Sequence, residues 1–479
     1  YGAKGLAYLA RDAGSGEIRS PIAKFLSEAE LAGLAPAPGE TWAPGKTSGK
    51  AGRTEGSNPA TQVAGSTFTV TVYLCDDFYN APNASVVATV NTSDPNDTNP
   101  GDQGLTGGFK NVDITLVTAS TEGWTINASG GGSYTDYTTP KIKVDPAPPS
   151  RLLVLAPNES HAPGTTTGKT GSVITQTAGV PFGITVLITD NRWNLVTTTS
   201  ALIGITTDDP YDVHPANNST TSGVVTFQIE FRRGVGEAYT ITASTAGGNN
   251  LAKYTTPAIT STFGNAEKLQ ILVPGETAVP GDWSNNGKSG TTEFWTADIQ
   301  RLITVNVVDK YWNKNTNVNT TVRLSADDPY YVPPSNQSTN FGSAEIWTTL
   351  VTATSTAGAG WKITASTAPG APASYLLPDT SPKIRVQSGT ASKLLVMAPG
   401  ESPLPGSSNG KQGTPSVQTA GVNFSVTAQA TDSKWNPSYS SATVRLTSND
   451  TYAPVIPDQQ LQDGVTVFVT QLITGNAAP

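Results

Sequence analysis

At 479 residues the chain is too long for a single hydrophobic core, and its length predicts three or four domains. Only 14% of its residues are charged, against roughly 25% in typical soluble domains, and its formal net charge of −8 argues against nucleic acid as a partner. No run approaches the roughly 20 apolar residues of a membrane-spanning helix, so no membrane span is predicted.

The first 27 residues, the N-terminal arm, contain two short strand patterns, GLAYLAR and RSPIAKF. Because side chains alternate between the two faces of a strand, one set of apolar and small residues is predicted to make contacts together: Leu6, Tyr8, Ala10, Pro21, Ile22 and Phe25. The following stretch, FLSEAELAGLA, has the spelling of a capping box from Ser27 to Glu30. It is compatible with a short helix or hinge, or with a plain linker.

From residue 28 onward the sequence repeats four times. Near its start each copy contains a Pro-Gly-Glu or Pro-Asn-Glu motif, which is followed by a glycine-rich loop containing GKxG. A strand pattern then ends in an acidic turn with an aromatic residue and Asn: DDFYN, DNRWN, DKYWN or DSKWN. The copies predict domains over 28–146, 147–265, 266–388 and 389–479.

Each copy contains about seven strand patterns. In the second copy these are RLLVLAP, SVITQTA, FGITVLITD, ALIGITTDD, VVTFQIEF, AYTITAST and PAITST. Alternation with a period of two, punctuated by Gly, Pro and Asn, is typical of β-sandwiches. The predicted fold class is therefore all-β, with tandem Ig-like sandwiches.

These patterns resemble a known family. AGVPFGITVLITDNRWN, IGITTDDP, GVVTFQIEF and YTITAS are similar to the bacterial Ig-like repeats that occur in tandem in surface and secreted proteins of the invasin/intimin type. The resemblance implies an extracellular stalk, adhesin or cell-surface fibre rather than an enzyme. The long GKxG loop and the aromatic residue in the turn depart from the family pattern and leave the kind of assembly open.

The two ends of the chain are predicted to be parts of one repeat. Copies one to three finish with an aromatic strand and a strand that starts with Pro, and 17 residues separate that Pro from the next repeat's first motif. The same spacing separates Pro21 from Pro38. The fourth copy stops before its last two strands, so 389–479 is predicted to be an incomplete sandwich.

An incomplete sandwich exposes apolar surface and unpaired strand edges. One hypothesis is strand addition in trans, in which the arm inserts into the fourth sandwich of an identical chain and builds a homopolymer, similar to donor-strand complementation in pili. The predicted acceptor edge is Val465, Val467, Val469 and Leu472. The alternatives are one period of a longer covalent adhesin or glycan-binding stalk, and an arm folded back onto its own fourth domain.

The sequence predicts neither catalysis nor a cofactor. Its two histidines, His161 and His214, lie in different copies, which argues against a catalytic triad or a histidine metal site. The GK motifs lack the spacing of a phosphate-binding loop, so their lysines are predicted to pair with an acid of a neighbouring domain. The single cysteine, Cys75, excludes an intramolecular disulfide and is predicted to be a buried apolar residue.

The acidic and aromatic residues of the repeated turns have two interpretations each. Asx turns are predicted at Asp77, Asp190, Asp309 and Asp432. Calcium is the weaker alternative, with candidate ligands Asp208, Asp209, Asp327 and Asp328. Packing over the turn or against the next domain is favoured over sugar stacking for Tyr79, Trp193, Trp312 and Trp435.

Overall fold

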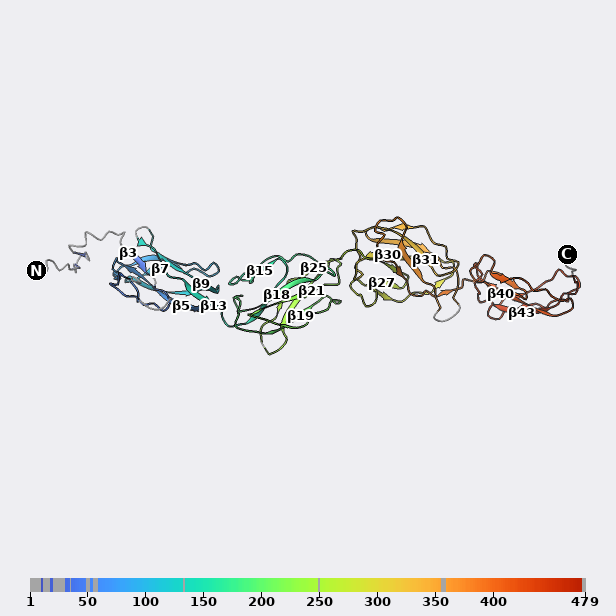
Figure 1. Ribbon diagram of the computed structural model, residues 1–479, viewed down its shortest axis with the longest axis horizontal. Coiled ribbons are helices and arrows are strands. Elements are labelled where there is room, and N and C mark those ends of the chain that lie inside the picture. The colour runs from blue at the N-terminus through green and yellow to red at the C-terminus, as the bar shows by residue number, and fades with distance from the viewer. Residues whose placement is uncertain are drawn as a thin grey trace.

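The computed structural model describes residues 10–11, 18–19, 31–34, 36–48, 52–54, 59–131, 134–248, 250–354 and 359–475. These residues contain no helix, and therefore none that is long and apolar enough to cross a membrane. Four β-sandwiches follow one another in a row, with β5 (Thr67–Cys75) and β43 (Val465–Thr470) toward opposite ends (Figure 1). The predicted all-β, Ig-like sandwich fold is confirmed.

The second sandwich shows a complete arrangement. Its sheets have the orders β14-β18-β21, β20-β19-β23-β24 and β17-β25-β22, and a hairpin of β15 and β16 carries the GKxG loop. The strands are β14 (Arg151–Leu155), β15 (Glu159–His161), β16 (Lys169–Gly171), β17 (Gln176–Thr177), β18 (Phe182–Thr189), β19 (Leu202–Thr207), β20 (Asn218–Ser219), β21 (Val224–Ile229), β22 (Ala238–Tyr239), β23 (Ile241–Thr245), β24 (Tyr254–Thr255) and β25 (Ile259–Thr262).

Alternating side chains build the core of this sandwich. Along β21, Val225, Phe227 and Ile229 are buried while the residues between them face solvent, as the two-residue period of a strand requires. The rings of Phe231 and Tyr239 lie 5.4 Å apart between the sheets. Strand β14 contacts β23 and β24, and these last strands of the repeat help to bury it.

The third and first sandwiches have related topologies. The third contains the sheets β26-β30-β33, β32-β31-β34-β35 and β29-β36. Its strands are β26 (Lys268–Leu272), β27 (Glu276–Ala278), β28 (Lys288–Gly290), β29 (Trp295–Thr296), β30 (Arg301–Val308), β31 (Thr321–Ala326), β32 (Gln337–Ser338), β33 (Ser343–Thr348), β34 (Ile363–Thr367), β35 (Asp379–Thr380) and β36 (Val386–Gln387).

The first sandwich contains the sheets β11-β3-β5-β8, β12-β10-β6-β7 and β4-β13-β9. Its strands besides β5 are β3 (Leu31–Leu34), β4 (Gln62–Val63), β6 (Val86–Thr92), β7 (Gly101–Leu105), β8 (Phe109–Thr115), β9 (Ser120–Trp124), β10 (Ile126–Ser129), β11 (Tyr134–Thr135), β12 (Tyr137–Thr138) and β13 (Ile142–Asp145). A helix at the predicted capping box does not extend into β3, which pairs with β5 as a strand. Ser27 to Glu30 lie outside the described residues.

The fourth sandwich has a smaller core than the other three, because residues 389–475 contain no counterparts of β22, β23, β24 and β25. Its sheets are β37-β40-β43, β38-β39 and β41-β42. The strands besides β43 are β37 (Lys393–Met397), β38 (Glu401–Pro403), β39 (Lys411–Gly413), β40 (Phe424–Thr431), β41 (Thr443–Val444) and β42 (Gln459–Gln460). Among the strands that the structure describes, β41 pairs with β42 alone, whereas its counterpart β19 pairs with both β20 and β23.

Two short strands are described in the N-terminal arm, β1 (Ala10–Arg11) and β2 (Ile18–Arg19). They pair with each other in antiparallel fashion. The complete sandwiches contain an equivalent pairing, β10 with β12 in the first and β23 with β24 in the second. The arm therefore has a hairpin of the kind that is not found among the described residues of the fourth sandwich.

Candidate functional site

The repeated acidic turn is an Asx-type turn in all four sandwiches. The Oδ1 atom of Asp190 accepts the backbone N–H groups of Arg192 and Asn194 at 2.7 and 2.9 Å. Asp309 and Asp432 do the same in their own turns. In the first sandwich the residue in this role is Asp76 and not Asp77, because Asp76 accepts the N–H groups of Phe78 and Asn80. The prediction was thus correct for the second, third and fourth sandwiches. In the first sandwich the predicted residue was one position too late.

The asparagine that closes this turn joins neighbouring sandwiches. Asn194 Nδ2 donates to the carbonyl of Val117 at 3.0 Å, and Asn194 Oδ1 accepts the N–H of Ala119 at 2.8 Å. Both partners belong to the preceding sandwich. Because the amide bonds one carbonyl and one N–H, it satisfies two backbone groups that the junction removes from water.

The same two bonds occur at the other two junctions. Asn313 bonds the carbonyl of Arg232 and the N–H of Gly234, both at 2.8 Å. Asn436 bonds the carbonyl of Val351 and the N–H of Ala353 at 2.9 and 2.8 Å. All three asparagines have no exposed surface. We call this arrangement the junction clasp: the aspartate and asparagine of the turn, with the loop that they contact.

The aspartate of the clasp fixes the linker between sandwiches. The Oδ2 atoms of Asp190, Asp309 and Asp432 accept the backbone N–H groups of Ala147, Gly264 and Gly389 at 2.8 to 2.9 Å. Burial raises the pKa of Asp309, and the amide groups that bond its carboxylate oppose that shift. The carboxylate therefore holds its own turn with one oxygen and the linker with the other.

A second repeated aspartate shapes the loop that receives the clasp. The Oδ2 atom of Asp94 accepts the N–H groups of Val117 and Thr118 at 2.8 Å each. Asp209, Asp328 and Asp450 hold the corresponding N–H groups in their own sandwiches. These bonds leave the carbonyl of Val117 and the N–H of Ala119, with their counterparts in the other sandwiches, free to bond the asparagine of the next sandwich.

The calcium candidates lie in this region but serve as hydrogen-bond acceptors. Asp209 and Asp328 hold loop amides as above, Asp208 accepts the N–H of Thr240 at 2.6 Å, and Asp327 accepts that of Lys362 at 2.6 Å. Within the described residues, no group of three or more His, Cys, Asp and Glu gathers at a possible metal site. Calcium at these residues remains a prediction.

The turn aromatics pack on the glycine-rich loop of their own sandwich. Trp193, Trp312 and Trp435 lie against Gly168, Gly287 and Gly410, where an added Cβ would come within 2.7 Å of the tryptophan. Cations also lie over the rings, at 4.6 Å for Arg151 on Trp193, 3.6 Å for Lys268 on Trp312 and 4.3 Å for Lys393 on Trp435. Trp312 is only 8% exposed. These contacts favour a packing role over sugar stacking.

The corresponding aromatic residue of the first sandwich also sits in its turn. The carbonyl of Tyr79 accepts the indole N–H of Trp42 at 2.9 Å. Tyr79 has a φ of 58°, close to the 64° to 65° of its tryptophan counterparts. The turn backbone is therefore the same in all four sandwiches.

The lysine of each described GK motif pairs with an acid of its own repeat. Lys169 lies 2.8 Å from Glu159 and Lys411 lies 2.9 Å from Glu401, while Lys288 lies between Glu276 and Asp379. Each glutamate is the acid of the repeat's first motif. The predicted pairing with a neighbouring domain is therefore wrong at these three motifs, because the β15–β16 type of hairpin brings the motifs together.

The predicted acceptor residues divide into two groups. Val465, Val467 and Val469 lie on β43, which pairs with β40, and their side chains are exposed. The last strands of the second sandwich pair with β17 and β19 and not with β21, the counterpart of β43. By that comparison the open edges within the described residues of the fourth sandwich are β41 and the segment around Gln418. The comparison favours these edges over β43 for an inserted strand, and the acceptor edge itself remains a prediction.

Leu472 fits the predicted acceptor better. Its counterpart Phe231 is fully buried beneath Tyr239 of the aromatic strand β22. Leu472 is only half-buried, because the fourth sandwich has no such strand within its described residues. On the arm, Ala10 lies in β1, while Leu6, Tyr8, Pro21, Ile22 and Phe25 lie outside the described residues.

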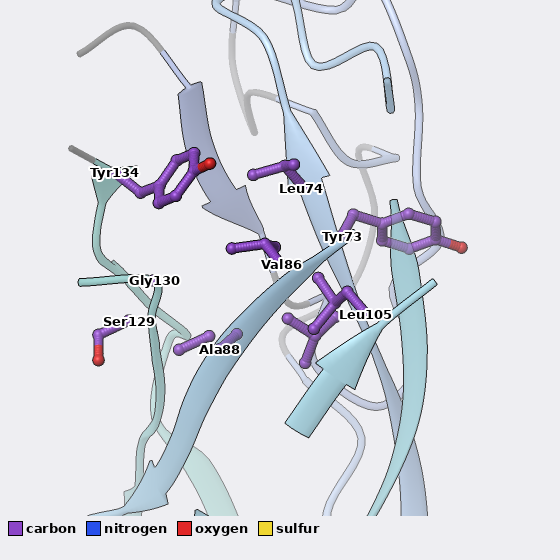
Figure 2. A pocket seen from close by; sticks show the side chains of 10 residues that line it. Tyr73, Leu74, Val86, Ala88, Leu105, Ser129, Gly130 and Tyr134 are labelled. Carbon is purple, nitrogen blue, oxygen red and sulfur yellow. The ribbon is translucent and has the colours of Figure 1, made fainter. Parts of the chain in front are cut away.

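The first sandwich also contains a small apolar pocket, which Figure 2 shows between Tyr134, Val86, Ala88 and Leu105. Its volume of about 10 Å³ is near the minimum that holds one water molecule. It is therefore a packing defect of the core and too small for a ligand.

No family model and no curated protein matches the chain in sequence. Solved structures that align with it include native Escherichia coli α2-macroglobulin, with 10% identity and a TM-score of 0.24 over 97% of this chain and 29% of that one. The *E. coli* adhesin FdeC aligns with 12% identity and a TM-score of 0.26, over 76% and 98% of the two chains. The FN1–FN3 domains of chicken CNTN1 align with 10% identity and a TM-score of 0.26, over 68% and 100%.

The chain spans only 29% of the length of the α2-macroglobulin that it aligns with. TM-scores this low carry no argument about function. The fold itself defines the class of protein: a tandem array of Ig-like β-sandwiches whose members are joined by repeated side-chain clasps.

Proposed function

We propose that the chain is a non-enzymatic structural subunit of an extracellular filament or surface fibre. In this proposal, residues 1–27 of one copy insert into the incomplete fourth sandwich of the next, and identical chains assemble head to tail. No cofactor and no nucleic acid take part. The observation that carries the proposal is the exposure of Leu394 and Val396 on β37, 51% and 44%, whereas their counterparts Leu152 and Val154 have no exposed surface.

The comparison between β37 and β14 supports the arm as the segment that would cover these side chains. In the second sandwich β14 is covered by β23 and β24, and the arm contains the similar β1–β2 hairpin. Burying a Leu or Val side chain fully contributes about 1.5–3 kcal/mol. Main-chain hydrogen bonds along the open edge of β41 would add affinity and fix the register of the inserted strand, as in other cases of strand addition.

Insertion in trans is favoured over insertion into the same chain because of the shape of the array. The first and fourth sandwiches lie at opposite ends of the row (Figure 1). An arm attached to the first sandwich would have to run back along two intervening domains to reach β37. A second copy supplies its arm at the open end directly, and a contact of this head-to-tail kind propagates.

Sedimentation velocity of the purified chain tests this proposal. The full chain of 49.6 kDa is expected to form polymers, and a chain lacking residues 1–27 is expected to remain a monomer. A synthetic peptide of residues 1–27 should shorten polymers of the full chain by occupying the open sandwich.

A matched pair of substitutions separates the acceptor from general surface effects. Val396→Asp places a charge on β37 and should prevent assembly. Val332→Asp makes the same change at a site that is 77% exposed in the third sandwich, and should assemble like the parent. If the chain without its arm assembles normally, or if the full chain is a monomer at every concentration, the proposal is wrong. The monomer result would favour one period of a longer covalent stalk.

A further inference from the structure

One glycine in each sandwich lies where the preceding sandwich docks, and within the described residues Gly45, the glycine of the first sandwich, has no other sandwich packed against it. Gly164, Gly281 and Gly406 each lie against the preceding sandwich, where an added Cβ would come within 2.1 to 2.6 Å of Thr118, Tyr211 or Thr352. Gly45 is the counterpart in the first sandwich and has the same kind of backbone, with a φ of 76°. Within the described residues, nothing lies within 4 Å of a Cβ built on Gly45.

The clasp turn of the first sandwich is also formed, and its asparagine is exposed instead of buried in a junction. Asn80 donates from Nδ2 to Asp76, and the N–H of Gly45 donates to the carbonyl of Phe78 at 2.7 Å. Gly164 makes the same bond to Arg192 at 2.9 Å in the second sandwich. Asn80 is nevertheless exposed, whereas Asn194, Asn313 and Asn436 are fully buried by the sandwich that precedes each of them.

The fourth sandwich, at the opposite end of the array, has the loop that corresponds to the receiving side of a junction clasp. Asp450 accepts the N–H groups of Ile473 and Thr474 at 2.6 and 2.9 Å, as Asp94 does for the loop that receives Asn194. By this correspondence the carbonyl of Ile473 and the N–H of Gly475 take the places of Val117 and Ala119. Tyr452, the counterpart of Tyr211, is 75% exposed, and Ile473 is 42% exposed.

We propose that these two half-junctions bind each other between successive copies of the chain. Asn80 of one copy would bond Ile473 and Gly475 of its neighbour, and Gly45 would pack against Tyr452 and Thr474. The inference rests on the proposed function, because the inserted arm brings the same two surfaces together. It adds a second, side-chain contact that continues the row of sandwiches from one copy into the next.

The test uses the full chain and three single substitutions. Asn80→Ala removes both bonds and should weaken assembly about tenfold, since a lost pair of buried bonds is worth on the order of one such factor. Asp77→Asn changes an exposed residue of the same turn and should have no effect. Gly45→Asn keeps a residue that tolerates positive φ but fills the docking space, and should weaken assembly at least as much. Circular dichroism establishes that each variant is folded.

A double-mutant cycle makes the test specific for the predicted pair. Gly475→Pro removes the N–H that Asn80 is proposed to accept. Asn80→Ala and Gly475→Pro remove the same contact from its two sides, one on each copy. The combined variant should therefore assemble no worse than whichever single variant assembles less well. If the combined variant is weakened by the product of the two single-variant factors, the inference is overturned.

The two proposals can fail separately. If the chain lacking residues 1–27 is monomeric while the Asn80→Ala chain assembles like the parent, arm insertion stands and the clasp between copies is overturned. If the chain lacking its arm assembles normally while Asn80→Ala weakens assembly tenfold, arm insertion fails and the clasp stands alone.

Discussion

The side-chain amide of Asn313 donates to the backbone carbonyl of Arg232 at 2.8 Å, across the junction between the second and third sandwiches. The two residues are 81 positions apart in the sequence. Because Asn313 itself is fully buried and the counterparts of this bond recur at the other two junctions, the relative placement of adjacent sandwiches depends on a few defined side chains.

Replacing Asn313 with Ala should loosen this junction without unfolding either sandwich. The change leaves the carbonyl of Arg232 and the N–H of Gly234 without their partner, at a cost of about 1–3 kcal/mol to the docked state. Small-angle X-ray scattering should then record a broader distribution of overall dimensions. Asn91→Ala, at an exposed position of β6, is the control, and an equal broadening there would contradict the role of Asn313.

Gly287→Ala should destabilise the third sandwich strongly. The new Cβ would come within 2.2 Å of Trp312, and the backbone φ of 65° already disfavours a side chain. We expect a loss of roughly 3 kcal/mol or more in the free energy of unfolding, measured with urea. Gly236→Ala has a similar positive φ of 85° but open space around its Cβ, so it should lose only about 1 kcal/mol. Equal losses would rule out the contact with Trp312 as the cause.

The loop that Asp450 holds should open in acid. The N–H groups of Thr474 and Ile473 and the hydroxyl of Thr474 lower the pKa of Asp450 to about 2. Because the folded-state pKa is depressed below the ordinary 3.8, the stabilisation is present above about pH 4 and is lost as the pH falls toward 2. Amide NMR signals of Ile473 and Thr474 should shift in that window. Asp450→Asn should remove the transition, and an unchanged transition in that variant would contradict the assignment.

Cys75 should be unreactive until the first sandwich unfolds. It has no exposed surface, and burial raises the pKa of its thiol to about 12, with a smaller contribution from the charge of Asp76. The reactive thiolate is therefore scarce at neutral pH. The rate of alkylation by iodoacetamide should rise in parallel with the unfolding of this sandwich in urea. Rapid labelling of the native chain would show that the cysteine is accessible.

The fold of each sandwich can be predicted from the sequence more fully than the contacts between sandwiches can. Alternation identified β14, β18 and β21, since a half-buried strand imposes a period of two on its own residues. The docking role of Asn194 is absent from such a pattern, because its partners lie 75 to 77 residues earlier, on another sandwich. The one available signal was the recurrence of Asn at the same place in all four turns.

The acceptor edge was harder to predict for a related reason. Alternation along β43 predicts a strand but not which strand lies beside it. In all three preceding sandwiches the last strands pair with the counterparts of β41 and of the segment around Gln418, and that comparison favours these two edges. The partner of Lys169 was likewise decided by a hairpin that folds the first motif of the repeat back onto the GKxG loop.

The most direct measurement of the central claim is hydrogen–deuterium exchange of the fourth sandwich, with and without the arm. In the assembled full chain, amides of β41 and of the segment around Gln418 should exchange much more slowly than in a chain lacking residues 1–27. Adding a peptide of residues 1–27 to the shortened chain should restore that protection. Equal exchange at these amides in all three samples would contradict insertion of the arm.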